Sequence, residues 1–286
     1  MSRILLNTIA LDPLRWAWPR HGYYRLADLI GKIATQTGFA SVEIWQYHLS
    51  VLSGDELDEV KSALRRHGIG VDVVGGYPVL AGDETSVSIR ELRALFATAA
   101  ELGASSIKIF VGNEASGEIS DDVWAKSLES LDTLIRSATE LGLEVNGETH
   151  QNTLFDDILA VEHVLTAIGK GRMGVCFQPY DFADSDGTIE TLRKLAPDVR
   201  HLHIQGRTKD GDFGELEAAP IDYRRLLGIL ARSEFQGPMS IEFVKDCIVA
   251  DPADFDLDLV LANAEADRVF LERIAMEAGV KVDRPA

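Results

Sequence analysis

Eight short apolar runs recur along the chain, and an amphipathic stretch of helix length follows each one. The runs predict strands at residues 4–8, 41–45, 70–75, 106–111, 143–148, 173–177, 200–204 and 239–243. The amphipathic stretches predict helices at residues 24–37, 55–67, 88–102, 121–141, 156–168, 189–195, 223–233 and 257–278. Strands that alternate with helices in this way form parallel sheets built from βαβ units. Eight such units predict an α/β fold, a single (β/α)8 TIM barrel, rather than an open sheet.

The length of 286 residues suits one barrel, and no Pro-, Ser- or Gly-rich stretch divides the chain. We therefore expect one domain over residues 1–286. Glycine follows four of the predicted helices, where it would end the helix, and the tail after residue 278 is expected to be loose; these glycines are Gly38, Gly68, Gly103 and Gly142. The first strand lacks a following Gly-x-Gly-x-x-Gly, so dinucleotide binding has no support.

Charge and composition limit the partners. The chain carries 28 Lys and Arg against 46 Asp and Glu, a net charge of -18, which argues against nucleic-acid binding. Cys176 and Cys247 both lie in apolar, strand-like segments, which indicates reduced thiols and a cytoplasmic protein. The sequence shows no signal peptide and no apolar run near the roughly 18 residues that span a bilayer, so no membrane partner is expected.

Polar residues gather at the carboxyl ends of the predicted strands, where barrels of this kind place their active sites. Seven strands end in such a residue: Asn7, Glu43, Lys108, Glu148, Gln178, His203 and Glu242. A buried carboxylate without a partner costs several kcal/mol, so these groups must pair with one another or bind a cation. One alternative is that Glu43, Lys108 and Asn7 form a buried ion-pair and hydrogen-bond network that does no chemistry. His201 is interpreted not as a ligand but as a core histidine or one that supports a ligand.

Four of these residues have the composition of a metal site. Glu148, Gln178, His203 and Glu242 offer two carboxylates, one amide oxygen and one imidazole. Such oxygen and nitrogen donors suit a hard or borderline divalent metal, with Mn²⁺ expected first and Mg²⁺ or Co²⁺ as alternatives. A thiolate zinc site does not fit, because the two cysteines lie at different depths along their strands.

Several short motifs resemble the xylose isomerase-like TIM barrel superfamily, which includes sugar isomerases, D-tagatose 3-epimerase-type enzymes, inosose dehydratase and endonuclease IV. The resemblance runs from residue 4 to about residue 244. It rests on Ser-Val-Glu-Ile-Trp at 41–45, Glu-Thr-His at 148–150, Val-Arg-His-Leu-His at 199–203, Pro-Ile-Asp-Tyr at 220–223 and Pro-Met-Ser-Ile-Glu at 238–242.

The resemblance implies that Glu148, Gln178, His203 and Glu242 hold the metal in the way of the epimerase-type members. The strand-six motif departs from the family pattern, since Gln178-Pro-Tyr-Asp181 stands where relatives have Asp-x-x-His. The site then carries two carboxylates rather than three, and Asp181 or Tyr180 replaces a substrate-contacting histidine. Arg207 resembles the arginine that follows the strand-seven histidine in epimerases, although its spacing from that histidine is shorter here.

These residues predict a metal-dependent sugar isomerase or epimerase that transfers a proton alpha to a carbonyl through an enediolate, with Glu148 and Glu242 as base and acid. The expected partner is a small carbohydrate or keto sugar, and the resemblance allows a homo-oligomer. Two alternatives stay open. One is a lyase, either a keto-cyclitol dehydratase or an enzyme that eliminates from a 3-keto glycoside, and the other is a non-catalytic sugar-binding or scaffold barrel. The residues expected to contact substrate are His150, Lys108, Arg207, Asp181, Trp45, Asn7 and Glu43; Trp16 and Trp18 are further candidates for stacking on a sugar.

Overall fold

The computed structural model describes residues 1–180 and 183–283. Over these residues eight parallel strands are hydrogen-bonded in chain order and close into a barrel. Each predicted strand is present, with ends that differ from the prediction by at most one residue, and the predicted fold is confirmed. The strands are β1 (Ile4–Asn7), β2 (Ser41–Ile44), β3 (Gly70–Gly76), β4 (Ser106–Phe110), β5 (Glu144–Glu148), β6 (Gly174–Phe177), β7 (Val199–Gln205) and β8 (Met239–Phe243).

Every predicted helix is also present. They are α1 (Leu26–Gln36), α3 (Gly54–His67), α4 (Thr85–Glu101), α5 (Asp121–Glu140), α6 (Ile158–Ile168), α7 (Ser185–Leu195), α8 (Tyr223–Arg232) and α9 (Leu257–Ala278). The structure adds α2 (Gln46–Leu49) and the 3-10 helices η1 (Thr8–Leu11), η2 (Leu216–Ala218) and η3 (Pro252–Asp254). These four elements are too short to show a helical period in the sequence. None of the helices in the described ranges is long and apolar enough to span a membrane.

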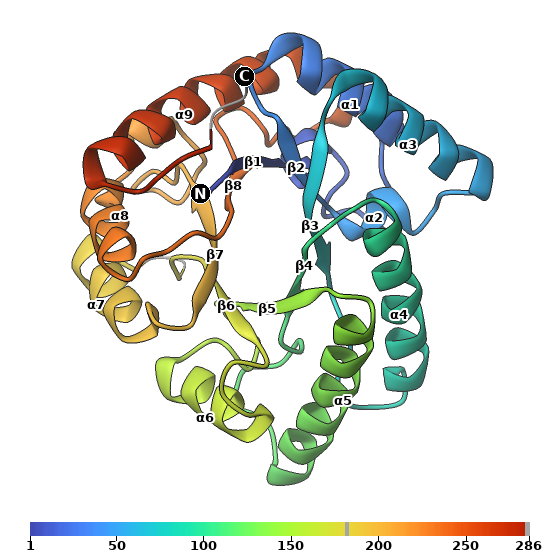
Figure 1. Cartoon of the computed structure of the whole chain (residues 1–286), viewed down its shortest axis with the longest axis vertical. Coiled ribbons are helices and arrows are strands. Elements are labelled where there is room, and N and C mark those ends of the chain that lie inside the picture. The colour runs from blue at the N-terminus through green and yellow to red at the C-terminus, as the bar shows by residue number, and fades with distance from the viewer. Residues whose placement is uncertain (181–182, 284–286) are drawn as a thin grey trace. The chain divides into compact units, whose positions relative to one another are not determined.

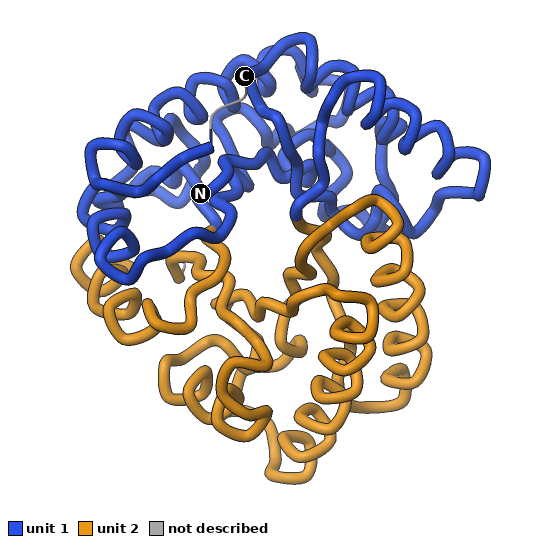
Figure 2. Tube along the Cα trace, viewed as in Figure 1, with its two compact units in different colours: residues 1–72, 203–286 blue, residues 73–202 orange. Residues whose placement is uncertain are grey.

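By its internal contacts the chain divides into two compact units, coloured separately in Figure 2. Unit 1 comprises residues 1–72 and 203–286, and unit 2 comprises residues 73–202. Both boundaries fall inside strands, β3 and β7, and not in a linker. The single domain over residues 1–286 stays a prediction.

In unit 1, strand β1 lies between β8 and β2, with Leu6 opposite both Ile241 and Val42. Helices α1, α3, α8 and α9 lie outside these strands (Figure 1). The three strands are buried throughout, because their side chains face the barrel interior on one side and the helices on the other. Their apolar residues fix the polar residues at the carboxyl ends in place.

In unit 2, strands β4, β5 and β6 are neighbours, and helices α4, α5 and α6 cover their outer side (Figure 1). Phe110 lies opposite Glu148, and Glu148 lies opposite Cys176. The register between β6 and β7 shifts between Val175 and Cys176. Such irregularities re-aim side chains and are common beside functional sites.

The helices end before all four predicted glycines, and three of these glycines have a positive φ. Gly68, Gly103 and Gly142 have φ values of 67°, 85° and 75°, in the left-handed region that favours glycine. Gly38 has no positive φ; a Cβ there would lie 2.8 Å from the guanidinium of Arg268, which would have to shift.

The expectation of a loose tail is wrong for residues 279–283. Gly279 caps α9 with a φ of 89°, and Val280 is buried. Val282 then forms a parallel bridge with Ser2. The tail is therefore held by backbone hydrogen bonds to the first residues of the chain.

Candidate metal and active site

In unit 1 a histidine at the end of β7 is fixed by a carboxylate from β2. The Nε2 atom of His203 lies 3.0 Å and 3.3 Å from the two carboxylate oxygens of Glu43. Both side chains are fully buried. Because a carboxylate accepts but does not donate, we assign the imidazole hydrogen to Nε2. This leaves the lone pair of His203 on Nδ1.

The same Nδ1 faces a second carboxylate. Oε1 of Glu242, on β8, lies 3.5 Å from Nδ1 of His203. A lone pair and a carboxylate oxygen repel each other at this distance unless a cation, either a proton or a metal ion, lies with them. A carboxylate that holds one imidazole nitrogen while the other nitrogen faces a second acidic group matches the way in which proteins orient histidine ligands to metals.

The other oxygen of Glu242 is held by a side chain that the sequence interpretation did not place in the site. Nε2 of Gln205 donates to Oε2 of Glu242 at 2.6 Å, and Nε of Arg207 donates to Oε1 of Gln205 at 3.0 Å. Arg207 therefore fixes which way the Gln205 amide faces. The hydroxyl of Tyr223, whose pKa burial raises to about 12, donates to the backbone carbonyl of Gln205 at 2.9 Å. Tyr223 thus holds the carboxyl end of β7, from which the side chain of Gln205 contacts Glu242.

In unit 2 the carboxylate at the end of β5 is paired with a lysine from β4. Nζ of Lys108 lies 2.6 Å from Oε2 of Glu148, and the two side chains are 0% and 1% exposed. The ammonium also lies 4.7 Å from the ring centre of Tyr77 and 5.1 Å from that of Phe110. These rings supply cation–π attraction and exclude water from the pair.

Gln178 follows β6 and is buried, and its backbone is held on both sides by one hydroxyl. Its N–H donates to Oγ1 of Thr149 at 2.8 Å, and that hydroxyl donates to the carbonyl of Gln178 at 2.7 Å. Thr149 is the middle residue of the Glu-Thr-His motif, so this motif also fixes the backbone of Gln178 after β6. No sequence signal singled out Thr149.

Two other residues of unit 2 that the sequence predicts to contact substrate, His150 and Tyr180, make local contacts. The ring of His150 packs on that of Phe110, with ring centres 4.4 Å apart, and its Nδ1 contacts the carbonyl of Gln151 at 2.7 Å. The hydroxyl of Tyr180 donates to the carbonyl of Phe155, and burial raises the pKa of Tyr180. Asp181 lies outside the described residues.

Two predicted substrate contacts in unit 1 have local partners. Oδ1 of Asn7 accepts from the N–H of Ile9 and caps helix η1. Trp45 is buried and packs edge-on against Tyr47 and His48, with ring centres 4.9 Å and 5.3 Å apart. Its indole N–H finds no acceptor within residues 1–180 and 183–283.

A thiol and an imidazole also meet inside unit 2. Cys176 on β6 lies opposite His201 on β7, and the Cys176 Sγ and a His201 ring nitrogen lie within 4.8 Å of each other. Both residues are fully buried. Burial supports the interpretation of His201 as a core residue.

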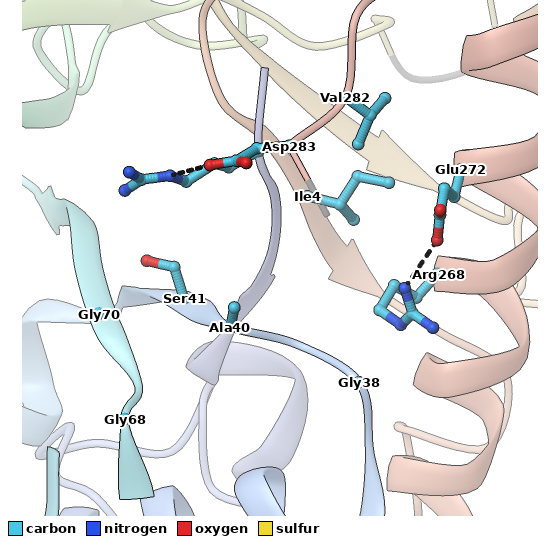
Figure 3. A pocket seen from close by; sticks show the side chains of 11 residues that line it. Ile4, Gly38, Ala40, Ser41, Gly68, Gly70, Arg268, Glu272, Val282 and Asp283 are labelled. Atoms are coloured by element: carbon cyan, nitrogen blue, oxygen red, sulfur yellow. Dashed lines mark hydrogen bonds and ion pairs between the residues drawn. The ribbon is translucent and has the colours of Figure 1, made fainter. Parts of the chain in front are cut away.

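A pocket of about 300 Å³ lies at the amino-terminal ends of β1, β2 and β3 in unit 1, the opposite strand ends from the candidate ligands (Figure 3). Arg268 and Glu272 pair in it at 3.0 Å, and Asp283 pairs with Arg3 at 3.4 Å (Figure 3). Paired charges at this end of a barrel serve stability more than chemistry. We therefore place no function in this pocket.

The model of the family described as xylose isomerase-like TIM barrel matches residues 32–263. The chain belongs to this family. Membership confirms the resemblance that the strand-end motifs indicate. Among curated proteins, none matches this sequence.

Solved structures with the same fold are similar over nearly their whole length. D-psicose 3-epimerase from Clostridium cellulolyticum H10, solved with D-tagatose, has a TM-score of 0.73 at 16% identity, covering 96% of this chain and 99% of that one. The 3-keto-D-glucoside 4-epimerase YcjR from E. coli has a TM-score of 0.69 at 18% identity, covering 96% and 100%. The probable 3-DHS dehydratase AsbF from Bacillus anthracis has a TM-score of 0.68 at 16% identity, covering 92% and 98%. At these identities the likeness shows the fold alone.

Proposed function

We propose that the protein is a metal-dependent sugar isomerase or epimerase, and that Glu148, Gln178, His203 and Glu242 bind one divalent ion. The observation that carries the proposal is the arrangement around His203, whose Nε2 is held by Glu43 while Nδ1 faces Glu242 at 3.5 Å. The four residues lie within two positions of the carboxyl ends of the consecutive strands β5 to β8. In barrels of this kind those strand ends form the active site.

The side chains that surround the proposed ligands fit a metal. Each of three ligands has one atom held by a neighbour: Glu148 by Lys108, His203 by Glu43 and Glu242 by Gln205. The second donor atom of each is then oriented for an ion, as in other metal sites with supporting hydrogen bonds. The oxygen-rich set suits Mn²⁺ best, with Mg²⁺ or Co²⁺ as alternatives.

Glu148 and Glu242 transfer the proton at the carbon beside the substrate carbonyl, one as base and the other as acid, through an enediolate. When bound, the ion supplies Lewis-acid polarisation of that carbonyl. Lys108, beside Glu148, places a positive charge where the oxygen becomes negative. His150, Arg207 and Trp45 contact the rest of a small carbohydrate or keto sugar.

The test is exchange of the substrate proton in D₂O, measured by NMR with candidate ketoses and keto glycosides. Glu148→Gln and Glu242→Gln keep the size of each side chain but remove its basicity, so each is expected to lower exchange by about 10²- to 10⁴-fold. Glu144→Gln is the control, since Glu144 starts β5 and is exposed. Full exchange in both the Glu148→Gln and the Glu242→Gln variants would contradict the proposal.

A lyase is the second candidate, and Gln178 is the observation that favours it. A neutral amide at this position removes one carboxylate from the family pattern, which alters the charge that the substrate meets. A keto-cyclitol dehydratase or a 3-keto-glycoside eliminating enzyme releases water or an aglycone, whereas an epimerase only exchanges a proton. The same NMR experiment separates them, because a lyase yields a new unsaturated product.

A further inference from the structure

Three aromatic rings of unit 1 form a row, and its middle ring belongs to Phe243, the residue that follows the candidate acid Glu242. Phe243 follows Glu242 on β8, and its ring stacks on that of Phe213 with centres 4.6 Å apart and planes 28° apart. The ring of Trp16, in the segment between η1 and α1, lies 6.2 Å from the Phe243 ring. We call Phe213, Phe243 and Trp16 the aromatic row.

The row is tied to the candidate site at its Phe213 end and is held by Arg15 at its Trp16 end. The Arg207 guanidinium lies 4.7 Å from the ring centre of Phe213, and Arg207 also holds Gln205, which donates to Glu242. At the other end the guanidinium of Arg15 lies 5.5 Å from the Trp16 ring and 5.9 Å from the Phe243 ring. A chain of direct contacts therefore joins the carboxylate of Glu242 to Trp16.

Trp16 is held in place and yet more than half exposed. Arg15, which supports it, is buried and donates to the carbonyls of Ile9 and Ala10 at 2.9 Å each. Trp16 itself is 58% exposed. Ordering a large side chain costs conformational entropy, and an indole ring left in water recovers little of it. A fixed, half-exposed indole is therefore a ready surface for a second flat ring.

We propose that the aromatic row binds a flat apolar group joined to the sugar, so that the substrate is an aryl glycoside or a similar conjugate and not a free monosaccharide. The proposal rests on the proposed function, because it places the sugar at Glu242. The cations beside Trp16 and Phe213 withdraw electron density from these rings, and electron-poor rings stack best on electron-rich ones. A phenolic ring is electron-rich, whereas an alkyl group offers no ring to stack.

Binding of phenyl β-D-glucopyranoside and methyl β-D-glucopyranoside, measured by calorimetry, tests the proposal. Neither glucoside has a carbonyl, so the measurement reports binding without turnover and stands apart from the proton-exchange experiment. We expect the phenyl glucoside to bind about tenfold more tightly, equivalent to about 1.4 kcal/mol. Trp16→Ala should abolish this preference, and Trp16→Leu, which keeps an apolar side chain, should abolish most of it.

Tyr23→Ala is the matched control, because Tyr23 is an aromatic residue in the same segment between η1 and α1 and is 48% exposed. It should keep the tenfold preference for the phenyl glucoside. Equal binding of both glucosides to the unaltered protein would overturn the proposal, as would a full preference in Trp16→Ala. If the protein is a dimer that dissociates in Trp16→Ala while the preference for the phenyl glucoside is unchanged, the aromatic row binds a second copy of the chain. That result would also overturn the proposal.

Discussion

The polar strand ends of unit 1 and those of unit 2 differ in charge. In unit 1 two carboxylates, Glu43 and Glu242, flank one imidazole. In unit 2 the carboxylate of Glu148 is paired with Lys108, and the second candidate ligand, Gln178, is neutral. A cation is therefore attracted by unit 1, while unit 2 balances its own charge. We infer that unit 1 sets the affinity for metal and that unit 2 limits it.

The largest expected effect is on stability, and it tests the balanced charge of unit 2. Lys108→Met removes the partner of a buried carboxylate, so the free energy of unfolding should fall by about 3–5 kcal/mol. Urea unfolding measures it. Lys126→Met is the control, since the Lys126–Asp122 pair is exposed and should contribute less than about 1 kcal/mol. An equal loss of unfolding free energy in the two variants would show that the buried Lys108–Glu148 pair stabilises the fold no more than an exposed pair does.

The next effect tests the role of Glu43 in unit 1. Glu43→Gln keeps an acceptor for His203 but removes the charge behind it. Mn²⁺ affinity should fall by about 10- to 100-fold, the usual cost of losing a group that orients a metal ligand. Calorimetry gives the constant, and Glu277→Gln, at a surface pair with Arg224, is the control. Unchanged affinity would mean that the Glu43–His203 pair is only structural.

The smallest expected effect is a gain in metal affinity. It tests whether the neutral Gln178 of unit 2 limits that affinity. Gln178→Asp restores a third carboxylate, and affinity for divalent ions rises with the number of charged ligands. We expect Mn²⁺ to bind about tenfold more tightly, a change of about 1.4 kcal/mol. Gln151→Asp adds the same charge in the loop after β5 and should leave affinity nearly unchanged. Weaker binding in Gln178→Asp would argue against Gln178 as a ligand.

The fold was predictable because apolar periodicity marks long elements well. The strand ends were predictable too, since parity along a strand tells which side chains share a face. The sequence did not predict which of those side chains are in contact with one another. Glu43 and His203 are 160 positions apart, and nothing in either strand identifies the other as its partner.

The division between ligand and supporting residue also needed the structure. Asn7, Glu43 and Lys108 look alike in the sequence, as polar residues at the ends of apolar strands. Asn7 caps a short helix, whereas Glu43 and Lys108 each hold a candidate ligand. Gln205 shares the parity of His203, and only its contact with Glu242 at 2.6 Å separates it from other polar residues of β7.

The central proposal is one divalent ion bound by Glu148, Gln178, His203 and Glu242, and a Mn²⁺ titration followed by electron paramagnetic resonance tests it most directly. The purified protein, stripped of metal with a chelator, should bind one Mn²⁺ per chain. His203→Ala in unit 1 and Glu148→Gln in unit 2 should each weaken this binding strongly, while the control Glu277→Gln should not. Binding that survives either ligand substitution unchanged, or no tight binding at all, would contradict the proposal.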